Sequence, residues 1–265
     1  MKNSEEIKQV VRDKYAALAQ PTTSSDGCCD DTCCGEEVTY FAEDYTSLAG
    51  YQADADLGLG CGLPTEYAHL QAGDTVVDLG SGAGNDCFVA RSIVGESGRV
   101  IGVDMTPAMV DKAQQNAKKL GYDNVTFRLG EIEQLPLEDN RADVVVSNCV
   151  LNLVPDKARA FQETFRILKS GGHFSISDVV LRGELPYGLR ESAELYAGCV
   201  SGALLQEDYL QAVEEAGFKN IKVQKERRIT LSDEVLQKHL SAEEAERFRQ
   251  SDAGIFSITV YAEKP

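Results

Sequence analysis

The 265-residue chain has little positive charge and no long apolar run, and each absence excludes a class of protein. Lys and Arg number 26 against 43 Asp and Glu, giving a net charge of −17, and no dense basic block occurs. We therefore expect no nucleic-acid partner, because phosphate recognition normally needs a basic patch. No segment approaches the roughly 18 consecutive apolar residues of a membrane span, so we expect no membrane partner. The acidity favours solubility and small neutral or cationic ligands.

The amino-terminal segment MKNSEEIKQVVRDKY also lacks the apolar region of a secretion signal. A cytoplasmic location is the resulting prediction. The eight cysteines would then lie in a reducing compartment, where structural disulfides are rare. We expect them to serve burial, metal binding or chemistry instead.

Residues 74–180 alternate short apolar runs with amphipathic segments. The pattern predicts strands in DTVVDLG, GRVIGVD, NVTFRLG, ADVVVSN and HFSISDVV. It predicts helices in NDCFVARSIV, in TPAMVDKAQQNAKKLG from the cap Thr106 to Gly121, and in DKARAFQETFRILKSGG up to Gly171. This alternation is typical of a parallel, doubly wound sheet that binds its ligand at the carboxyl ends of the strands.

The flanking segments add helices and two more strands. Residues 5–19 have apolar side chains at helical spacing. LPYGLRESAELYAGCVSGALL predicts a helical insertion, and LQEDYLQAVEEAGF predicts an amphipathic helix. NIKVQKERRIT and IFSITVYAEKP predict strands on either side of a charged helical stretch, which brings the sheet to seven strands.

The segment DLGSGAG places a glycine-rich turn directly after the first strand. Its spacing is G-x-G-x-G, which differs from the dinucleotide pattern G-x-G-x-x-G and counts against a dehydrogenase, and it has no Lys for a phosphate. An acidic residue before the turn, Asp78, suits a cationic group of a ligand. Asp104 ends the second strand, where an acidic side chain can bind ribose hydroxyls.

These residues together resemble the class I S-adenosylmethionine-dependent methyltransferases. The resemblance implies that the glycine motif holds the amino-acid part of this cofactor, that the acid after the second strand binds its ribose, and that the segment after the third strand flanks its adenine. The cofactor-binding residues it implies are Asp78, Gly80, Ser81, Gly82, Gly84, Asp104, Met105, Glu131, Ile132 and Asn148.

We therefore predict an α/β fold: a Rossmann-like, doubly wound, seven-stranded S-adenosylmethionine methyltransferase sheet with a helical insertion and a smaller C-terminal region. Residues 1–37 would form an N-terminal helix and a flexible Cys-rich arm. Residues 38–180 would form the cofactor-binding methyltransferase domain. Residues 181–265 would form an insertion that caps the substrate and a C-terminal α+β region.

Three single cysteines lie in segments where chemistry could occur. Cys149 follows the fourth strand, beside the expected cofactor, and a soft sulfur there suggests a soft substrate. Cys61 lies in the glycine-flanked segment LGLGCGLP, and Cys199 lies in YAGCVSG of the predicted insertion. Each could equally be a buried core cysteine, which is the reading we favour for Cys87. Their convergence on one site does not follow from the sequence.

The segments LGLGCGLP, DLGSGAGNDC, GVDMT, SNCVLNLVPDK, LKSGGHFSISDV and YAGCVSGAL together resemble arsenite S-adenosylmethionine methyltransferases. The resemblance implies that Cys61, Cys149 and Cys199 bind trivalent arsenic as thiolates. It also implies that a further cysteine, nearer the N-terminus, forms a transient disulfide with Cys61. Some relatives have an aromatic pair where this chain has Leu59 and Gly60, so an aromatic contact to the substrate is not expected here.

The implied activity is arsenic detoxification. Arsenite, or its thiol conjugate, would be methylated to mono- and then dimethylated species, with thioredoxin or glutathione as the thiol reductant. The chemistry agrees, because thiolates select soft ions and leave arsenic a lone pair that can attack a methyl group without a general base. None of the three histidines lies in a motif. The alternatives are a methyltransferase acting on a carbon of a quinone or other small molecule, and a non-enzymatic metalloid-binding protein.

The remaining cysteines gather in the polar segment CCDDTCC, as Cys28, Cys29, Cys33 and Cys34. A zinc site there is possible from the spacing of Cys29 and Cys33, but adjacent cysteines suit one tetrahedral ion poorly. We favour a redox role for the segment, in which one of its thiols pairs with Cys61 during turnover. Which thiol would do so stays open.

Overall fold

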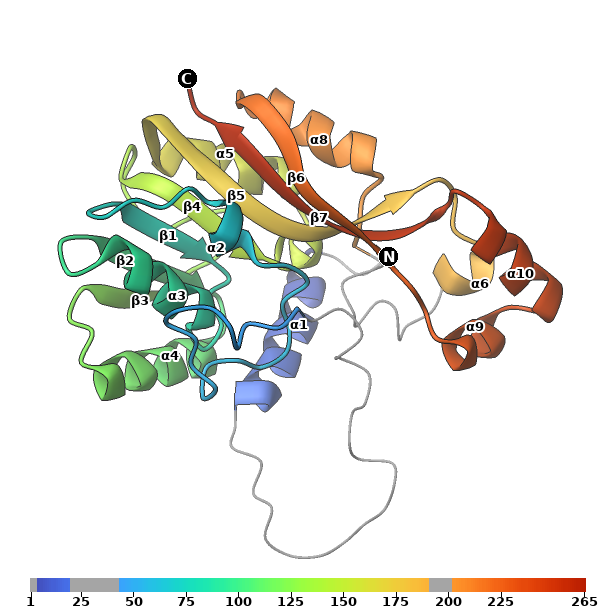
Figure 1. The fold of residues 1–265 in the computed structure, drawn as a ribbon, viewed down its shortest axis with the longest axis horizontal. Helices are drawn as coiled ribbons and strands as arrows, with labels where there is room; N and C mark the ends of the chain where they lie inside the picture. Colours follow the sequence, from blue (N-terminus) through green and yellow to red (C-terminus); the bar gives the residue numbers. More distant parts are fainter. Residues whose placement is uncertain (1–3, 20–42, 191–201) are drawn as a thin grey trace, which may run out of the picture.

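The computed structural model describes residues 4–19, 43–190 and 202–265. Its centre is a seven-stranded sheet in the order β3-β2-β1-β4-β5-β7-β6 (Figure 1). The strands are β1 (Thr75–Leu79), β2 (Arg99–Asp104), β3 (Val125–Leu129), β4 (Ala142–Asn148), β5 (Leu168–Arg182), β6 (Lys219–Ile229) and β7 (Gly254–Glu263). The predicted α/β class and the seven strands are therefore confirmed.

The two late strands make the sheet mixed. Strands β3, β2, β1, β4 and β5 are parallel neighbours, whereas β7 runs antiparallel to both β5 and β6. The pairs from Ser177 with Thr259 to Arg182 with Gly254 place the first half of β7 beside the end of β5. This end of β5 leads to the site described below.

Helices cover both faces of this sheet. They are α1 (Ser4–Ala19), α2 (Pro64–Tyr67), α3 (Asn85–Val94), α4 (Pro107–Leu120), α5 (Lys157–Ile167), α6 (Tyr187–Arg190), α8 (Gln206–Glu215), α9 (Asp233–His239) and α10 (Ala242–Gln250), with a 3₁₀ turn η1 at Leu151–Leu153. No helix among the described residues is both long and apolar enough to cross a bilayer.

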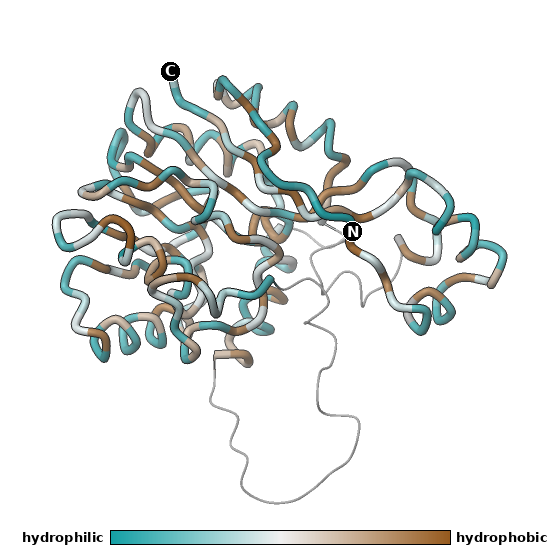
Figure 2. The backbone as a smooth tube through the Cα atoms, in the orientation of Figure 1, coloured by the Kyte–Doolittle hydropathy of each residue, from teal (hydrophilic) through white to brown (hydrophobic). Residues whose placement is uncertain are grey.

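Side-chain alternation along the central strands builds two separate cores. In β1, Val77 packs in the core that includes Phe161 of α5, and Val76 packs in the core that includes Phe88 of α3. The reason is the period of two along a strand, which sends successive side chains to opposite faces. Because both faces are covered, apolar residues follow one another in the central strands, as in Val76–Val77 of β1 and Val144–Val146 of β4, and the sheet contains brown segments in Figure 2.

One predicted helix end is wrong. The sequence predicted that the helix beginning near residue 156 continues to Gly171, but α5 ends at Ile167 and β5 begins at Leu168. Leu168 pairs with Ala142 of β4, and the Gly171 amide donates to the Lys264 carbonyl at 2.9 Å. The backbone groups of this segment therefore find partners in neighbouring strands rather than in a further helical turn, a long-range effect that local sequence does not carry.

Helices α6, α9 and α10 lie together beyond the ends of β5 and β7 (Figure 1). Their apolar side chains, among them Leu189, Leu236 and Ala245, belong to one cluster that also contains Cys61 and Cys149. Only the two ends of the predicted helical insertion, residues 185–190 and 202–205, are described, because residues 191–201 lie outside the described chain. The division into three regions stays a prediction.

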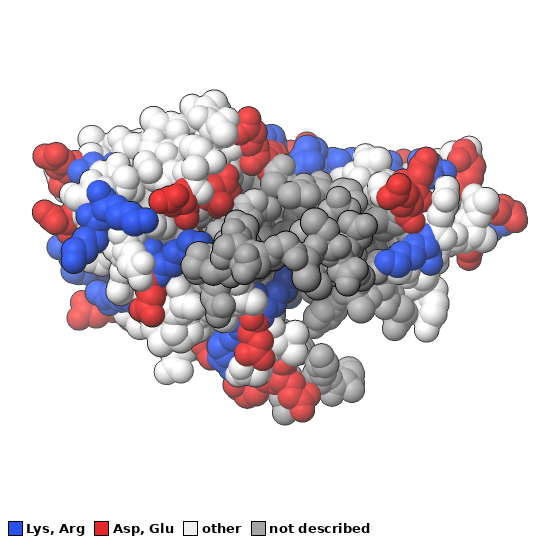
Figure 3. Space-filling view, turned by 90° about the horizontal axis from the view of Figure 1, so that it is seen from below, with Lys and Arg blue, Asp and Glu red and all other residues white. Residues whose placement is uncertain are grey.

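Charged side chains of both signs are interspersed on the face shown in Figure 3. Among the described residues visible there, Lys and Arg do not merge into one continuous surface. The net charge of −17 is thus spread over many separate groups.

A buried carboxylate fixes the connection between β3 and β4. Glu163 of α5 is 3% exposed and accepts hydrogen bonds from the Leu135 amide at 2.9 Å and from Arg166 at 2.7 and 2.8 Å. Arg159 extends the anchor by donating to the Glu133 carbonyl at 3.1 Å. These contacts hold the segment that carries Glu133 against α5.

Replacing Glu163 with Gln should lower the free energy of unfolding by about 1.5–3 kcal/mol, because charged hydrogen bonds are lost. Hydrogen bonds from Arg166 hold the pKa of Glu163 below its ordinary 4.5, so its stabilisation is present above 4.5 and disappears as pH falls through the folded value. Urea unfolding at pH 7.5 and pH 3.5 measures both effects. The exposed Glu246→Gln is the control, with a change within about 0.5 kcal/mol, and an equal loss in both variants would contradict the anchor.

Candidate functional site

A pocket opens at the carboxyl ends of β1, β2 and β4, where the sequence placed the ligand. Most of the predicted cofactor residues line it: Asp78, Gly80, Ser81, Gly82, Asp104, Met105, Ile132 and Asn148. Two predicted residues do not. Gly84 is the cap of α3, and Glu131 instead binds Lys8 at 2.7 Å and Arg12 at 3.2 Å. Glu133, two residues further on, lines the pocket in its place.

The glycine turn approaches its neighbours too closely for a side chain. Gly80 has a φ of 70°, and a Cβ there would lie 2.5 Å from Val150, the residue after Cys149. Its amide donates to the Val103 carbonyl at 2.7 Å, which ties the turn to the end of β2. The turn therefore leaves backbone rather than side chains at the pocket wall, as a closely approaching ligand needs.

Asp104 is held by backbone amides on both sides. Gly82 and Thr106 donate to its carboxylate at 2.9 and 2.8 Å. Burial raises the pKa of Asp104, and these amides partly offset the shift. The Ser81 hydroxyl oxygen, buried in the same turn, has no hydrogen-bond partner within the described part of the chain. A hydroxyl and a fixed carboxylate thus meet the pocket together, which suits a ligand with several hydroxyl or amine groups.

Two further carboxylates face each other at the base of the pocket. Asp78 is 2% exposed and accepts a hydrogen bond from the Cys87 thiol at 3.2 Å. Burial, followed by the charge of Asp86, raises the pKa of Asp78 well above its ordinary value. Burial also raises the pKa of Asp86 to about 6. Two carboxylates that resist ionisation in a pocket favour a cationic partner, whose charge would relieve both costs. The predicted burial of Cys87 is confirmed.

Asn148 connects this pocket to the loop that carries Cys61. Its Oδ1 accepts hydrogen bonds from the amides of Cys61 and Gly62 at 3.0 and 3.3 Å, and its Nδ2 donates to the Gly62 carbonyl at 2.7 Å. Nδ2 also contacts the Tyr45 hydroxyl, which in turn donates to Asp86 at 2.9 Å. Gly60 permits this approach, because a Cβ there would lie 2.6 Å from Asn148.

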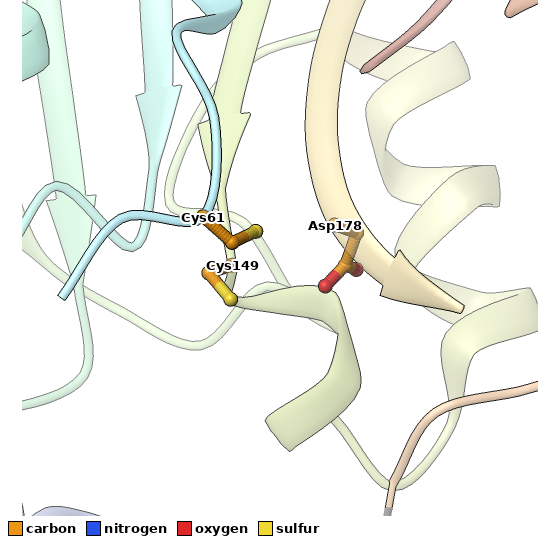
Figure 4. A group of neighbouring side chains, drawn as sticks. All are labelled: Cys61, Cys149 and Asp178. Carbon is orange, nitrogen blue, oxygen red and sulfur yellow. The ribbon is translucent and has the colours of Figure 1, made fainter. Parts of the chain in front are cut away.

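The structure brings Cys61 and Cys149 together. Both are buried, and their sulfur atoms lie within 4.8 Å of each other and of an Asp178 carboxylate oxygen (Figure 4). Cys149 also lines the cofactor pocket. Its φ of 59° costs about 1–2 kcal/mol in an L-residue, and its amide donates to the Ser177 carbonyl at 2.8 Å. The turn directs the thiol away from the β4 ladder. Cys199 and the four cysteines of CCDDTCC lie outside the described residues.

Several pocket residues were missed from the sequence. Helix α1 contributes Lys8, Val11 and Tyr15 to the pocket. Tyr45 reaches the pocket through a long-range contact with Asp86, and no local motif marks it. Asp86 lies two residues after the glycine turn, within the segment DLGSGAGNDC, but was not singled out. Asp178 had a readable signal, because a carboxylate at the carboxyl end of the predicted fifth strand points toward the ligand edge of a doubly wound sheet.

Comparisons with known proteins agree with this geometry. A family model described as a methyltransferase domain matches residues 70–217. An arsenite methyltransferase of Halobacterium salinarum is 44% identical over 239 residues, covering 84% of this chain and 60% of that protein. The human arsenite methyltransferase is 39% identical over 188 residues, covering 68% and 50%. The chain thus spans about half to three fifths of the length of these relatives.

Solved structures also resemble this chain. An arsenic(III) S-adenosylmethionine methyltransferase from Chlamydomonas reinhardtii is 39% identical with a TM-score of 0.65, covering 77% of this chain and 67% of that one. The YcgJ protein of Bacillus subtilis, at 21% identity and a TM-score of 0.61, shares the fold. With a family model over more than half of its residues, the chain belongs to the methyltransferase-domain family that uses S-adenosylmethionine as cofactor.

Proposed function

We propose that the protein methylates trivalent arsenic, taken as arsenite or its thiol conjugate, to mono- and then dimethylated species. The observation that carries the proposal is the buried pair Cys61 and Cys149, whose thiols meet beside the cofactor pocket. Soft sulfur ligands select a soft, thiophilic substrate such as trivalent arsenic. The arsenite methyltransferases among the relatives support the same substrate.

The pocket residues fit S-adenosylmethionine. Asp78 and Asp86 would hold its ammonium group, whose positive charge matches two carboxylates that burial keeps hard to ionise. Asp104 and the unpartnered Ser81 hydroxyl would hold its ribose hydroxyls, and Ile132 would flank its adenine. When bound, this cofactor supplies an electrophilic methyl group on a sulfonium sulfur.

Cys61 and Cys149 hold the arsenic substrate, with Cys199 as the third thiolate. Three sulfur ligands leave trivalent arsenic one lone pair, which is the nucleophile. The attacking atom carries no proton, so the site needs no general base. What the chain contributes is position: Asn148 fixes the Cys61 loop and the left-handed turn fixes Cys149, so both ligands are held before the substrate arrives.

Repeated turnover needs a source of electrons, because attack by the lone pair oxidises arsenic by two electrons. Oxidation of Cys61 and one thiol of the CCDDTCC segment to a disulfide would return two electrons to arsenic. Thioredoxin or glutathione would then reduce the disulfide. Both reductants are available in the cytoplasm, which is the location we propose. The result for the cell is arsenic detoxification.

A carbon methyltransferase is the second candidate. A demethylmenaquinone methyltransferase of Oceanobacillus iheyensis is 33% identical over 104 residues, which is 39% of this chain. Such an enzyme would not need Cys61 or Cys149, whereas the proposed activity depends on both. A non-enzymatic metalloid-binding protein would need the thiols but would transfer no methyl group.

The affinity for S-adenosylmethionine should fall as pH decreases through about 6. Asp86 loses its charge below its pKa of about 6 and then no longer attracts the ammonium group. We expect the dissociation constant at pH 5.0 to exceed that at pH 7.5 by about tenfold, which corresponds to one pKa unit. Isothermal titration calorimetry measures it.

Two variants test the assignment of this pH dependence. Asp86→Asn should bind more weakly at pH 7.5 and show little further change with pH. The control Asp143→Asn alters a carboxylate near the start of β4, which binds Lys169 and the Thr75 amide, and should keep the wild-type profile. A wild-type dissociation constant that does not change between pH 7.5 and 5.0 would count against the role of Asp86.

Cys61→Ser, Cys149→Ser and Cys199→Ser should each reduce methylation of arsenite at least about 100-fold, because a hydroxyl is a hard ligand and trivalent arsenic is soft. The measurement incubates full-length protein with arsenite, a thiol and S-adenosylmethionine and then separates the arsenic species. Affinity for S-adenosylmethionine, measured in parallel, should stay near the wild-type value. Undiminished methylation in all three variants would sink the proposal.

The CCDDTCC segment should act in later methylation rounds. Replacing Cys33 alone with Ser should change the rates little, since three similar thiols remain. Replacing Cys28, Cys29, Cys33 and Cys34 together should slow the second methylation more than the first, because only regenerated enzyme performs it. Single-turnover and multiple-turnover assays separate the two rounds, and an equal loss in both would point to a different role.

A further inference from the structure

A carboxylate completes the thiol pair as a set of three ligands. Cys61 comes from the loop before α2, Cys149 from the end of β4 and Asp178 from β5. One ligand atom from each lies within 4.8 Å of the other two, and all three residues are buried. Figure 4 shows the two sulfur atoms and the carboxylate directed toward a common space.

Asp178 is buried at a cost that its surroundings offset only in part. Burial raises the pKa of Asp178 to about 7, although the Val179 amide, the Lys157 charge and the nearby Asn152 and Tyr209 groups lower it. It is 0% exposed, and its Oδ1 accepts one hydrogen bond, from the Val179 amide at 3.0 Å. Its Oδ2 has no hydrogen-bond partner among the residues that the structure describes, and neither does the Tyr209 hydroxyl. The charges of Asp178, Cys61 and Cys149 raise the pKa of Tyr209, after burial, so this phenol faces the same cluster.

An unpartnered carboxylate oxygen in an apolar setting costs several kcal/mol unless a cation or a donor meets it. Among the described residues, Lys157 supplies a positive charge that lowers the pKa of Asp178, but the effect of burial outweighs it. Trivalent arsenic does not meet the carboxylate either, because a soft metalloid held by thiolates has little use for a hard oxygen ligand. A cation that accepts sulfur and oxygen together would bind both thiolates and also meet the unpartnered oxygen.

We propose that Cys61, Cys149 and Asp178 form a binding site for a borderline-soft divalent cation, of which Zn²⁺ is the best match. Two thiolates and a carboxylate bind Zn²⁺ at about 2.3 and 2.1 Å, which sets the ligand atoms about 3.5–3.8 Å apart in a tetrahedron. Small side-chain rotations would close the described separations to that spacing. The fourth position stays open for water or an external thiol, and the Tyr209 hydroxyl lies where an outer hydrogen bond to Asp178 can form.

The inference rests on the proposed function at one point, since the same two thiols would hold arsenic. Zinc and arsenite would then exclude each other. Binding displaces the two thiol protons to solvent, and no group is oxidised or reduced. Asp178 distinguishes zinc binding from arsenic binding, because it is a proposed ligand of zinc and not one of the three thiolate ligands of arsenic.

The test uses the full-length chain with Cys28, Cys29, Cys33, Cys34 and Cys199 replaced by Ser, so that other thiols outside the cluster cannot compete. Zn²⁺ is titrated against a chromophoric chelator. We expect one bound ion, and Asp178→Asn on this background should weaken binding at least about tenfold, the minimum seen when partners of metal ligands are removed. The controls Asp143→Asn and Cys87→Ser should leave the zinc affinity unchanged.

A variant-independent measurement covers the case in which Asp178→Asn does not fold. X-ray absorption of the zinc-loaded background protein should give a first shell of two sulfur atoms with oxygen or nitrogen atoms completing it. A shell of sulfur alone, the absence of stoichiometric binding, or a folded Asp178→Asn with unchanged affinity would each overturn the site.

The two proposals can fail separately. Zn²⁺ should inhibit arsenite methylation by the wild-type protein competitively with arsenite. Stoichiometric zinc binding by a protein that does not methylate arsenite would overturn the arsenic proposal and keep the zinc site. If stoichiometric Zn²⁺ does not inhibit methylation of arsenite, the zinc site is overturned and the arsenic proposal is kept.

Discussion

The side-chain amide of Asn148 is the contact on which the geometry of the site depends. It lies at the end of β4, between the pocket proposed for the cofactor and the loop that carries Cys61, and uses its oxygen and its nitrogen to bind that loop. A primary amide suits this position because it accepts and donates in one plane. Through Tyr45 and Asp86 the same network reaches the carboxylates at the base of the pocket. One half-buried side chain therefore connects the pocket to the Cys61 loop.

The antiparallel part of the sheet supports the Cys61 loop, which we call the acceptor side of the site because Cys61 is a proposed ligand of the methyl acceptor. Strand β7 runs antiparallel beside β5, and its Ser257 hydroxyl donates to the Cys61 carbonyl at 2.5 Å, while Thr259 meets Ser177 at 2.9 Å. The Cys61 loop is thus held by Asn148 on one side and by β7 on the other. Ser257 and Cys61 are 196 positions apart in the chain, so a C-terminal strand helps to hold the backbone of the loop that carries this thiol.

Much of the cofactor side could be predicted because it is local. A glycine turn after a buried strand and an acid after the next strand carry their geometry in short segments, and Gly80, Gly82 and Asp104 line the pocket as expected. Gly84 and Glu131 do not line the pocket, because Gly84 caps α3 and Glu131 pairs with Lys8 and Arg12 of α1. The end of α5 failed because strand pairing overrides local helical preference.

The acceptor side was harder to predict because it depends on contacts between distant segments. The sequence indicated Cys61 and Cys149 as candidates but not their proximity, and Tyr45 and Asp178 were not identified at all. These contacts arise from the sheet order, which places the end of β5 beside the end of β4. Local sequence patterns therefore predict the cofactor more readily than they predict the long-range arrangement of residues around Cys61 and Cys149.

Helix α1 forms part of the pocket wall and is held there by ion pairs. The Lys8 ammonium is almost buried and binds Glu131 at 2.7 Å and Glu133 at 3.2 Å, while Val11 and Tyr15 line the pocket. Because salt screens interactions between partly exposed charges, these ion pairs should weaken as ionic strength rises. The part of the pocket wall that α1 forms would then be held less firmly, whereas the residues at the strand ends are fixed by the sheet itself.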